Sequence, residues 1–541
     1  MQAQLAGLII ALASMSVIAG EVSLLDAAES GDRAMALKLL EEGSDARARG
    51  PDGTTALMWA AHYGEVELVE RLIAAGAEVS AQNEFGAYAL NEAAIIGSVP
   101  IIKALLDAGA DPNQRNPEGE TALMVVARNG KVEAARLLVD AGADVNAKER
   151  WGGQSAVMWA AAQSQPAMIE FLASRGAELD ARGVTRQWER KTITEPRPKD
   201  MNKGGFTPLL YAAREGCVEC ARKLIEAGAD PDLGDPERVT PLVMALLNLH
   251  FDFAAYMIEA GADVDKWDLF GRTPLYMAAD THTLPVMGNG AMVVIPSMDE
   301  HTALDVAREL LEAGANPNMR LKRRPPYRNV PQDRNGDTIL AQGATPLLRA
   351  ARAGDAEFVK LLLDHGALVD LPSKEGVTPL MAAAGVEYGL RVTRGRNRTE
   401  EGVLATLRLL VDAGADINAR MVMEPNSKTY GTGSQRRNSF SYQDGGRNGR
   451  QVPSPQAVPH HTALHGAAMK GFTSIVDFLV ANGAELETLD GNGRTPLDLA
   501  MGRYEEDFLR QAAEPHVETV ELLERLIAAR GEAPSARVAP D

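Results

Sequence analysis

The sequence predicts an all-α solenoid in which one two-helix unit recurs about twelve times along the 541 residues. The clearest copy, residues 205–232, reads GFTPLLYAAREGCVECARKLIEAGADPD. Thr207 can cap a first helix that opens at Pro208, Gly216 can end that helix, and Gly228 can end a second one. Helices of this length are marginal in water on their own. Each unit is therefore expected to bury its apolar faces against its neighbours.

The cap of the first helix recurs at a nearly fixed interval, and six of the ten intervals are 33 residues long. The expected cap residues are Thr55, Tyr88, Thr121, Ser155, Thr207, Thr240, Thr273, Thr345, Thr378, Thr462 and Thr495. This period, with the Thr-Pro-Leu pattern at several caps, resembles the ankyrin repeat. The resemblance covers roughly residues 22–530. It implies an ankyrin-repeat solenoid of helix–turn–helix units joined by β-hairpin finger loops.

Two departures from the family pattern predict local differences. The ankyrin signature continues Thr-Pro-Leu with a histidine. That histidine is present only in Thr462-Ala463-Leu464-His465, where a structural role is expected. In the other units apolar packing is expected to replace its hydrogen bonds. Asn248-Leu249 stands where glycine usually closes the first helix, so a less regular turn is expected there.

Intervals longer than 33 residues locate insertions and divide the repeats into 22–182, 205–318, 343–419 and 462–530. Three inserts are basic and follow a second helix, at 183–204, 319–342 and 420–461, the last of them Gly/Ser/Pro-rich and flexible. Two more are expected between the helices of one unit, an apolar one at 281–300 with a hairpin turned at Asn289-Gly290, and one at 386–402. The last unit is expected to end in an amphipathic cap helix, and residues 531–541 in a disordered tail.

Residues 1–19 are interpreted as a signal peptide of bacterial style. The apolar run from Leu5 to Ile18 is too short for a membrane span, and Ala19 completes a small-residue cleavage pattern. The segment lacks the usual Lys or Arg, so the alternative is an apolar first helix that packs on the solenoid of a cytoplasmic protein. Export implies a periplasmic or secreted protein without a membrane span after cleavage.

Charge separates the inserts from the repeats. The chain carries a net charge of -19, which argues against nucleic acid as the main partner. The three basic inserts hold 18 Lys or Arg against 7 Asp or Glu. They could bind an acidic glycan, lipid head group or nucleic acid, or they could simply offset the acidic repeats. The candidate anion-binding residues are Arg323, Arg324, Tyr327, Arg436 and Arg437.

The usual motifs of catalysis are missing from the sequence. It contains no phosphate-binding loop, HExxH metal helix, GxSxG elbow or dinucleotide fingerprint, so no catalytic residue, metal or cofactor is predicted. Cys217 and Cys220 could form a redox pair or half a metal site. Alternatively, Cys220 fills an apolar slot while Cys217 lies in a turn. His460, His461 and His465 are interpreted as structural.

The resemblance also indicates where a protein partner would bind. In ankyrin proteins, partners usually contact the finger tips and the two residues before the glycine that ends the first helix. Those positions are His62, Tyr63, Ile95, Ile96, Arg128, Asn129, Arg214, Glu215, Met469 and Lys470. Trp59 and Trp159 could form a ligand platform or belong to the core between repeats.

The predicted function is a monomeric, non-catalytic protein-binding scaffold with a concave binding surface. The alternatives are an anion binder and a redox accessory protein.

Overall fold

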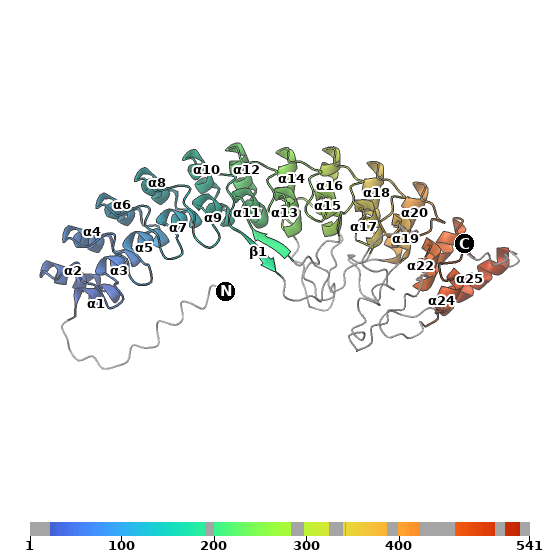
Figure 1. Ribbon diagram of the computed structural model, residues 1–541, viewed down its shortest axis with the longest axis horizontal. Helices are drawn as coiled ribbons and strands as arrows, with labels where there is room; N and C mark the ends of the chain where they lie inside the picture. Colours follow the sequence, from blue (N-terminus) through green and yellow to red (C-terminus); the bar gives the residue numbers. More distant parts are fainter. Residues whose placement is uncertain are drawn as a thin grey trace. The chain divides into compact units, whose positions relative to one another are not determined.

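The computed structural model describes residues 22–189, 200–282, 297–323, 339–340, 342–386, 399–421, 460–503 and 514–530. The chain divides into an N-terminal unit, Met1–Val184 with Glu226–Gly228, and a C-terminal unit, Thr185–Ile225 with Ala229–Asp541. Within each unit the helices come in pairs. The first helices of successive pairs form one row and the second helices form another (Figure 1).

The described part of the N-terminal unit contains five helix pairs. They are α1 (Leu24–Glu29) with α2 (Arg33–Glu41), α3 (Ala56–His62) with α4 (Val66–Ala74), α5 (Ala89–Ile96) with α6 (Val99–Asp107), α7 (Ala122–Arg128) with α8 (Val132–Asp140), and α9 (Ala156–Ala162) with α10 (Pro166–Ser174). Isolated β-bridges pair Arg49 with Thr55 and Arg115 with Thr121 at the connections between pairs.

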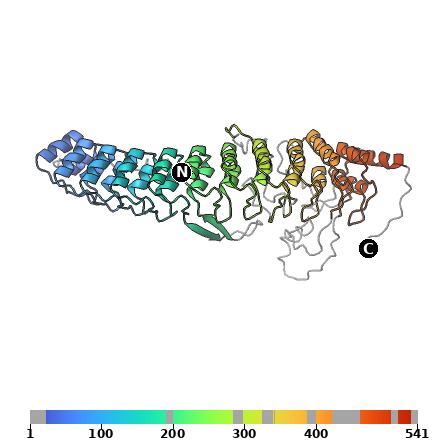
Figure 2. The ribbon, with the colours of Figure 1, turned by 90° about the horizontal axis from the view of Figure 1, so that it is seen from above.

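The C-terminal unit begins with a two-stranded antiparallel sheet, β1 (Thr185–Glu189) and β2 (Asp200–Gly204), in which Thr185 pairs with Gly204. Figure 2 shows this sheet on the side of the loops that join the helix pairs. Seven helix pairs follow among the described residues. They are α11 (Pro208–Glu215) with α12 (Val218–Glu226), α13 (Pro241–Asn248) with α14 (Phe251–Glu259), α15 (Pro274–His282) with α16 (Ala303–Glu312), α17 (Pro346–Ala353) with α18 (Ala356–Asp364), α19 (Pro379–Ala384) with α20 (Glu400–Asp412), α22 (Ala463–Met469) with α23 (Thr473–Ala481), and α24 (Pro496–Ala500) with α25 (Val517–Arg530).

Each expected cap residue stands directly before its first helix, which confirms the reading of the repeat. At most of these caps the threonine Oγ accepts a hydrogen bond from the backbone N–H three residues later, as Thr207 does from Leu210 at 3.3 Å. Tyr88 and Ser155 are exceptions, since neither side chain makes a cap hydrogen bond. The Tyr88 hydroxyl is buried and donates to the carbonyl of Gln114 at 2.8 Å instead. This burial raises the pKa of Tyr88 well above its ordinary value.

The core is a repeated set of small and branched apolar side chains. In the second pair, Leu57, Ala60 and Ala61 of α3 are buried, as are Leu68 and Leu72 of α4. Each fully buried leucine contributes about 1.5–3 kcal/mol, and neighbouring pairs complete the burial because α3 packs against both α4 and α5. The predicted solenoid of about twelve helix-turn-helix units is confirmed.

The sequence predicts a less regular turn at Leu249, and this prediction is wrong. Leu249 adopts the left-handed conformation (φ 65°, ψ 33°), close to that of Gly97 at the same place four units earlier in the ankyrin pattern (φ 70°, ψ 33°). The turn keeps its shape at a backbone cost of about 1–2 kcal/mol, because a Cβ is disfavoured in this conformation. Packing of the two helices therefore overrides the local preference of leucine.

Several predicted segments lie outside the described residues. These are the signal peptide at 1–19, the hairpin at Asn289-Gly290, the tail at 531–541, and most of the inserts at 319–342, 386–402 and 420–461. No helix in the described ranges has the length and apolar character needed to cross a membrane.

Candidate functional site

Three of the partner-binding pairs expected from the sequence lie on neighbouring helices of the N-terminal unit. They close α3, α5 and α7, which pack against one another in that order (Figure 1). We call these six residues the N-terminal row: His62, Tyr63, Ile95, Ile96, Arg128 and Asn129. The helix–turn geometry of the repeat thus gathers side chains that are 33 residues apart in the sequence.

An aromatic cluster forms the α3 end of the row. The Tyr63 ring stacks on Trp59 with centroids 6.0 Å apart, and the His62 ring meets both edge-on. His62 Nδ1 lies 2.9 Å from Glu92 Oε2 of α5, so the cluster is tied to the next repeat. Trp59 is half-buried and Tyr63 is exposed, so Trp59 belongs partly to the surface rather than wholly to the core.

Two isoleucines occupy the middle of the row. The side chains of Ile95 and Ile96 are 45% and 41% exposed. Together they form a small apolar patch at the end of α5. The Ile96 side chain also reaches the turn glycine of the previous repeat, Gly64, where an added Cβ would approach it to 3.3 Å.

The α7 end of the N-terminal row is formed by a cation–π contact. The Arg128 guanidinium lies 5.5 Å from the ring centroid of Trp159, at the distance of a cation–π contact. Asn129 Nδ2 donates to the Ile95 carbonyl at 3.1 Å, and the Tyr63 hydroxyl donates in the same way to the Glu29 carbonyl at 2.9 Å. The second residue of these two pairs therefore braces one repeat to the previous one.

The side chains of the other expected pairs are engaged with one another or half-buried. In the C-terminal unit, Arg214 forms an ion pair with Glu215 at 2.7 Å and lies over the Tyr211 ring. The Arg214 carbonyl contacts His250 Nε2 at 3.0 Å, which repeats the brace seen in the N-terminal unit. Met469 and Lys470, at the end of α22, are half-buried.

Two further exposed aromatic residues were not anticipated from the sequence. Phe85 and Trp151 lie in turns that join helix pairs of the N-terminal unit, and both are exposed. The family pattern expects partners at these finger positions. An aromatic residue in the turn was the available sequence signal, but it does not decide exposure, because Phe270 at the repeat position of Phe85 is buried.

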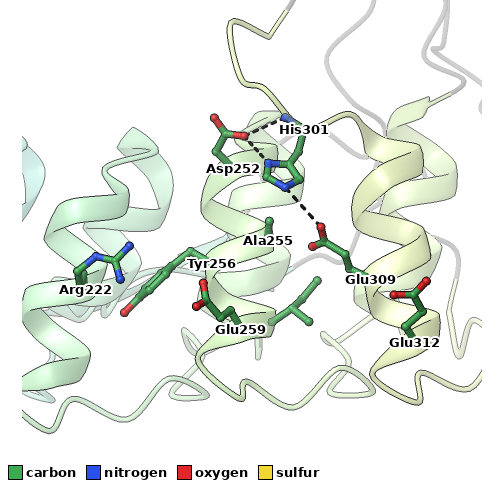
Figure 3. Close-up of a pocket in the computed structure, with 9 residues that line it drawn as sticks. Arg222, Asp252, Ala255, Tyr256, Glu259, His301, Glu309 and Glu312 are labelled. Carbon is green, nitrogen blue, oxygen red and sulfur yellow. Dashed lines mark hydrogen bonds and ion pairs between the residues drawn. The ribbon is translucent and has the colours of Figure 1, made fainter.

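A shallow groove of about 420 Å³ crosses the second helices α12, α14 and α16 (Figure 3). His301, just before α16, points between two carboxylates, with its Nδ1 2.7 Å from Asp252 Oδ1 and its Nε2 3.4 Å from Glu309 Oε1. The hydrogen bond to Asp252 raises the pKa of His301. Burial raises the pKa of Asp252, but hydrogen bonds from His301 outweigh it and leave that pKa lowered.

The groove has no clear chemical task. His301 links α14 to the start of α16, so its carboxylate partners are engaged rather than available for acid–base catalysis. In the described ranges, no group of three or more His, Cys, Asp or Glu side chains is placed to hold a metal ion. No sequence signal marked His301, because it directly follows an insert.

Comparison with known families decides the identity of the fold. The model "Ankyrin repeats (3 copies)" matches residues 24–116, 90–183, 209–288 and 300–421, and the model "Ankyrin repeat" matches 460–490. Together they cover more than half of the chain. The chain belongs to the ankyrin repeat family. Ankyrin repeats indicate a protein-interaction scaffold, and the fold is typically non-enzymatic.

The curated relatives of this ankyrin chain match it over part of its length. Ankyrin repeat and SOCS box protein 16 of Mus musculus is 29% identical over 29% of this chain and 25% of its own length. Ankyrin repeat and KH domain-containing protein 1 of Homo sapiens is 32% identical over 28% of this chain and 4% of its own. The crystal structure of the human ASB11 ankyrin repeat domain covers 44% of this chain and 98% of that one, with 20% identity and a TM-score of 0.37.

The ankyrin position that is open in the N-terminal row is buried in the middle of the C-terminal unit. Asp280 and Arg352 both stand at the repeat position of His62. Arg349 stands at the repeat position of Trp59. Their side chains are only 3%, 1% and 0% exposed. Arg349 Nε donates to Asp280 Oδ1 at 2.7 Å, and Arg352 Nη1 donates to the Val386 carbonyl at 2.8 Å. A charged residue at this repeat position does not by itself predict burial, because Arg128 and Arg214 stand there too and are not buried.

The predicted structural role of His465 is confirmed. His465 is fully buried, its Nδ1 lies 2.9 Å from the Thr462 hydroxyl, and its Nε2 lies 3.3 Å from the Arg494 carbonyl of the next ankyrin repeat. Burial lowers the pKa of His465 to about 4. His461 is also buried, with its Nε2 3.4 Å from Asp490 Oδ2.

Cys217 and Cys220 form a disulfide bond. Cys220 fills a buried core position, as expected, but Cys217 is not simply a turn residue.

Of the candidate anion-binding residues, only Arg323 lies in the described ranges, where it is exposed and its backbone N–H donates to the Phe270 carbonyl at 3.0 Å. Arg324, Tyr327, Arg436 and Arg437 lie outside the described residues.

Proposed function

We propose that this ankyrin protein is a scaffold whose N-terminal row binds a protein partner through an exposed apolar segment of that partner. The observation that carries this proposal is the pair Ile95 and Ile96, exposed between the Trp59–Tyr63 cluster and the Arg128–Trp159 contact. Aromatic and arginine side chains around an apolar centre are the usual anchors of protein interfaces.

The row suits a partner better than the other helix-one ends do. Arg214 and Glu215 satisfy one another, and Asp280 and Arg352 are buried. By contrast, covering the two isoleucines removes apolar surface from water, which favours association by roughly 25 cal/mol for each Å² buried. The partner would complete a surface that the repeats leave open.

A comparative pull-down tests the proposal. The protein with Ile95→Ser and Ile96→Ser is expected to lose the partner captured by the unchanged protein, with the same helix content. Leu368→Ser is the matched control, because Leu368 is 57% exposed but lies in the C-terminal unit. Loss of the same captured protein by the Leu368→Ser control, or its retention by the double isoleucine variant, would refute the row as the binding surface.

Export is part of the proposal. The apolar run at residues 5–18 supports a signal peptide. The Cys217–Cys220 disulfide supports it too, because disulfides persist mainly in oxidising compartments. The mature chain is expected to begin near Gly20, which N-terminal sequencing of the protein from its own source would check. An intact residue 1 on cytoplasmic protein would refute export.

The second candidate is anion binding by the basic inserts. Exposed Arg323 supports it, as does its neighbour Lys322, whose Nζ lies 3.4 Å from the Trp267 ring centroid. Changing Arg323, Arg324, Arg436 and Arg437 together to Ser is expected to weaken partner binding several-fold at low salt. Stability should change by no more than about 0.5 kcal/mol per substitution, since surface changes are usually that small. Binding that is insensitive to both salt and these substitutions would leave the N-terminal row as the better candidate.

A further inference from the structure

The disulfide between Cys217 and Cys220 lies at the turn from α11 into α12, and these are the only cysteines of the chain. Cys220 stands at a core position that Leu68, Ile101 and Ala134 fill in other repeats, all of them buried. Apolar packing therefore explains a small buried residue at 220. It does not explain a sulfur at 217, where other repeats carry polar residues such as Ser98 and Lys131.

Stabilisation of the fold is a weak explanation for this crosslink. The bond joins residues three apart, so the loop that it closes is very short. In the chain-entropy account, the stabilisation grows with the length of the closed loop, so a loop of this size contributes much less than a long one. The helix pair already has the buried core that its neighbours have without any crosslink.

The surroundings of the two sulfurs suit exchange chemistry. Cys217 is half-buried and therefore within reach of solvent, whereas Cys220 is 0% exposed. The backbone N–H of Cys220 donates to Cys217 Sγ at 3.2 Å, because Cys217 directly precedes α12. The N–H groups at a helix start stabilise negative charge, so they would stabilise a thiolate on Cys217 after reduction.

The turn itself is held in place. Gly216 has the left-handed backbone (φ 73°), and the His250 ring lies so close that an added Cβ would approach its Nδ1 to 2.5 Å. His250 Nε2 contacts the Arg214 carbonyl at 3.0 Å. The exposed Arg214 and Glu215 therefore stand at a fixed position just before Cys217, where a bound protein could place a thiol beside the disulfide.

We propose that Cys217–Cys220 is a thiol–disulfide exchange site that oxidises a dithiol of another protein. The first substrate thiolate attacks Cys217 Sγ, forms a mixed disulfide, and releases Cys220 as a thiolate that takes up a proton. The second substrate thiolate then attacks the substrate sulfur of the mixed disulfide and releases Cys217. The substrate dithiol becomes a disulfide, and the two cysteines of the protein become thiols, with both protons accounted for. This activity goes beyond the scaffold role and can be measured without the scaffold's partner.

The test uses oxidised full-length protein and a reduced synthetic peptide that carries two cysteines, at neutral pH without denaturant. After trapping with N-ethylmaleimide, mass spectrometry is expected to show an oxidised peptide and a protein labelled at both cysteines, while far-ultraviolet circular dichroism stays unchanged. The control is Cys217→Ser with Cys220→Ala, since alanine occupies the equivalent core position at Ala134. Peptide oxidation no faster than with this control, or reduction of the bond only in denaturant, would overturn the proposal.

Single variants test the order of attack. With oxidised glutathione as the probe, Cys220→Ala is expected to form a mixed disulfide at Cys217 about tenfold faster or more than Cys217→Ser forms one at Cys220, because thiolate stabilisation and access both favour Cys217. Equal rates in the two variants, with both still folded, would contradict the assignment of Cys217 as the attacked sulfur.

Discussion

At the end of the first helix, three repeats of the N-terminal unit and two repeats in the middle of the C-terminal unit of this ankyrin protein use one repeat position in opposite ways. In the N-terminal unit, His62, Ile95 and Arg128 stand there at the surface or partly buried. In the C-terminal unit, Asp280 and Arg352 stand at the same place and are almost fully buried. The repeat sets the direction of a side chain along the helix, but the neighbouring structure decides whether that direction leads to solvent or to protein.

The contrast extends to the chemistry of the two units. The N-terminal unit places apolar and aromatic side chains on its surface, while both units bury methionines, such as Met58 in the N-terminal and Met381 in the C-terminal unit. The C-terminal unit buries ionisable groups, Arg349 and His465 among them. A buried ionisable group is costly unless it is paired, so its contribution to stability depends on its partner and on pH. The stability that apolar core side chains contribute depends neither on a charged partner nor on pH.

The largest expected effect is in the buried ion pair. Asp280→Ala removes the carboxylate that Arg349 Nε contacts at 2.7 Å and leaves a buried guanidinium without it. Such a change costs about 3–5 kcal/mol of unfolding free energy. His62→Ala breaks the partly exposed contact with Glu92 and should cost at most about 1 kcal/mol. Urea denaturation followed by circular dichroism measures both.

A double variant separates the charge from the packing in this pair. Asp280→Leu with Arg349→Met removes both charges and keeps apolar volume, so it should recover most of the lost stability. If Asp280→Ala costs as little as His62→Ala, the contrast between the two units is wrong at this position.

The next effect is a pH dependence that comes from His465. Its pKa is lowered to about 4 in the folded protein, against an ordinary value of 6.5. Between these values the unfolded chain binds a proton that the folded chain does not, so stability falls as the pH is lowered from 6.5 towards 4. From pH 7 to pH 5 the expected loss is about 2 kcal/mol.

The variant His465→Leu isolates this contribution, because leucine stands at the equivalent place in Leu210 and Leu348. The difference in unfolding free energy between pH 7 and pH 5 should shrink by most of the expected loss. A pH dependence that is identical in the variant would assign the effect to other groups.

The smallest effect is in the turn that closes the first helix. Ser164 adopts φ 54° and is exposed, at a place where Gly64 and Gly130 stand in other repeats of the N-terminal unit. Ser164→Gly should raise the unfolding free energy by about 1 kcal/mol, because it removes the Cβ from a left-handed residue without loss of packing. Leu249→Gly should gain less, since the Leu249 side chain is half-buried and its packing is lost. A gain at Leu249 larger than at Ser164 would show that its side chain contributes nothing to the core.

The sequence by itself determined the repeat and its local geometry. Thr207 and the other caps, Pro208 at the first helical position and Gly216 at the turn act through backbone preferences that span only a few residues, so they can be read without the fold. The places of His62, Ile95 and Arg128 in the N-terminal row followed from the same 33-residue period. The signal peptide and the ends of the inserts stay predictions.

The tertiary structure alone decided which of these positions face solvent and which groups meet. Asp280 and Arg349 are 69 residues apart, and their contact depends on how neighbouring helices pack rather than on any local pattern. The same holds for the brace from Asn129 to the Ile95 carbonyl and for His301 between Asp252 and Glu309. Even the Cys217–Cys220 bond, which joins residues only three positions apart, depends on the tertiary structure. It forms because α12 begins at Val218, and the start of this helix brings the two sulfurs onto one turn.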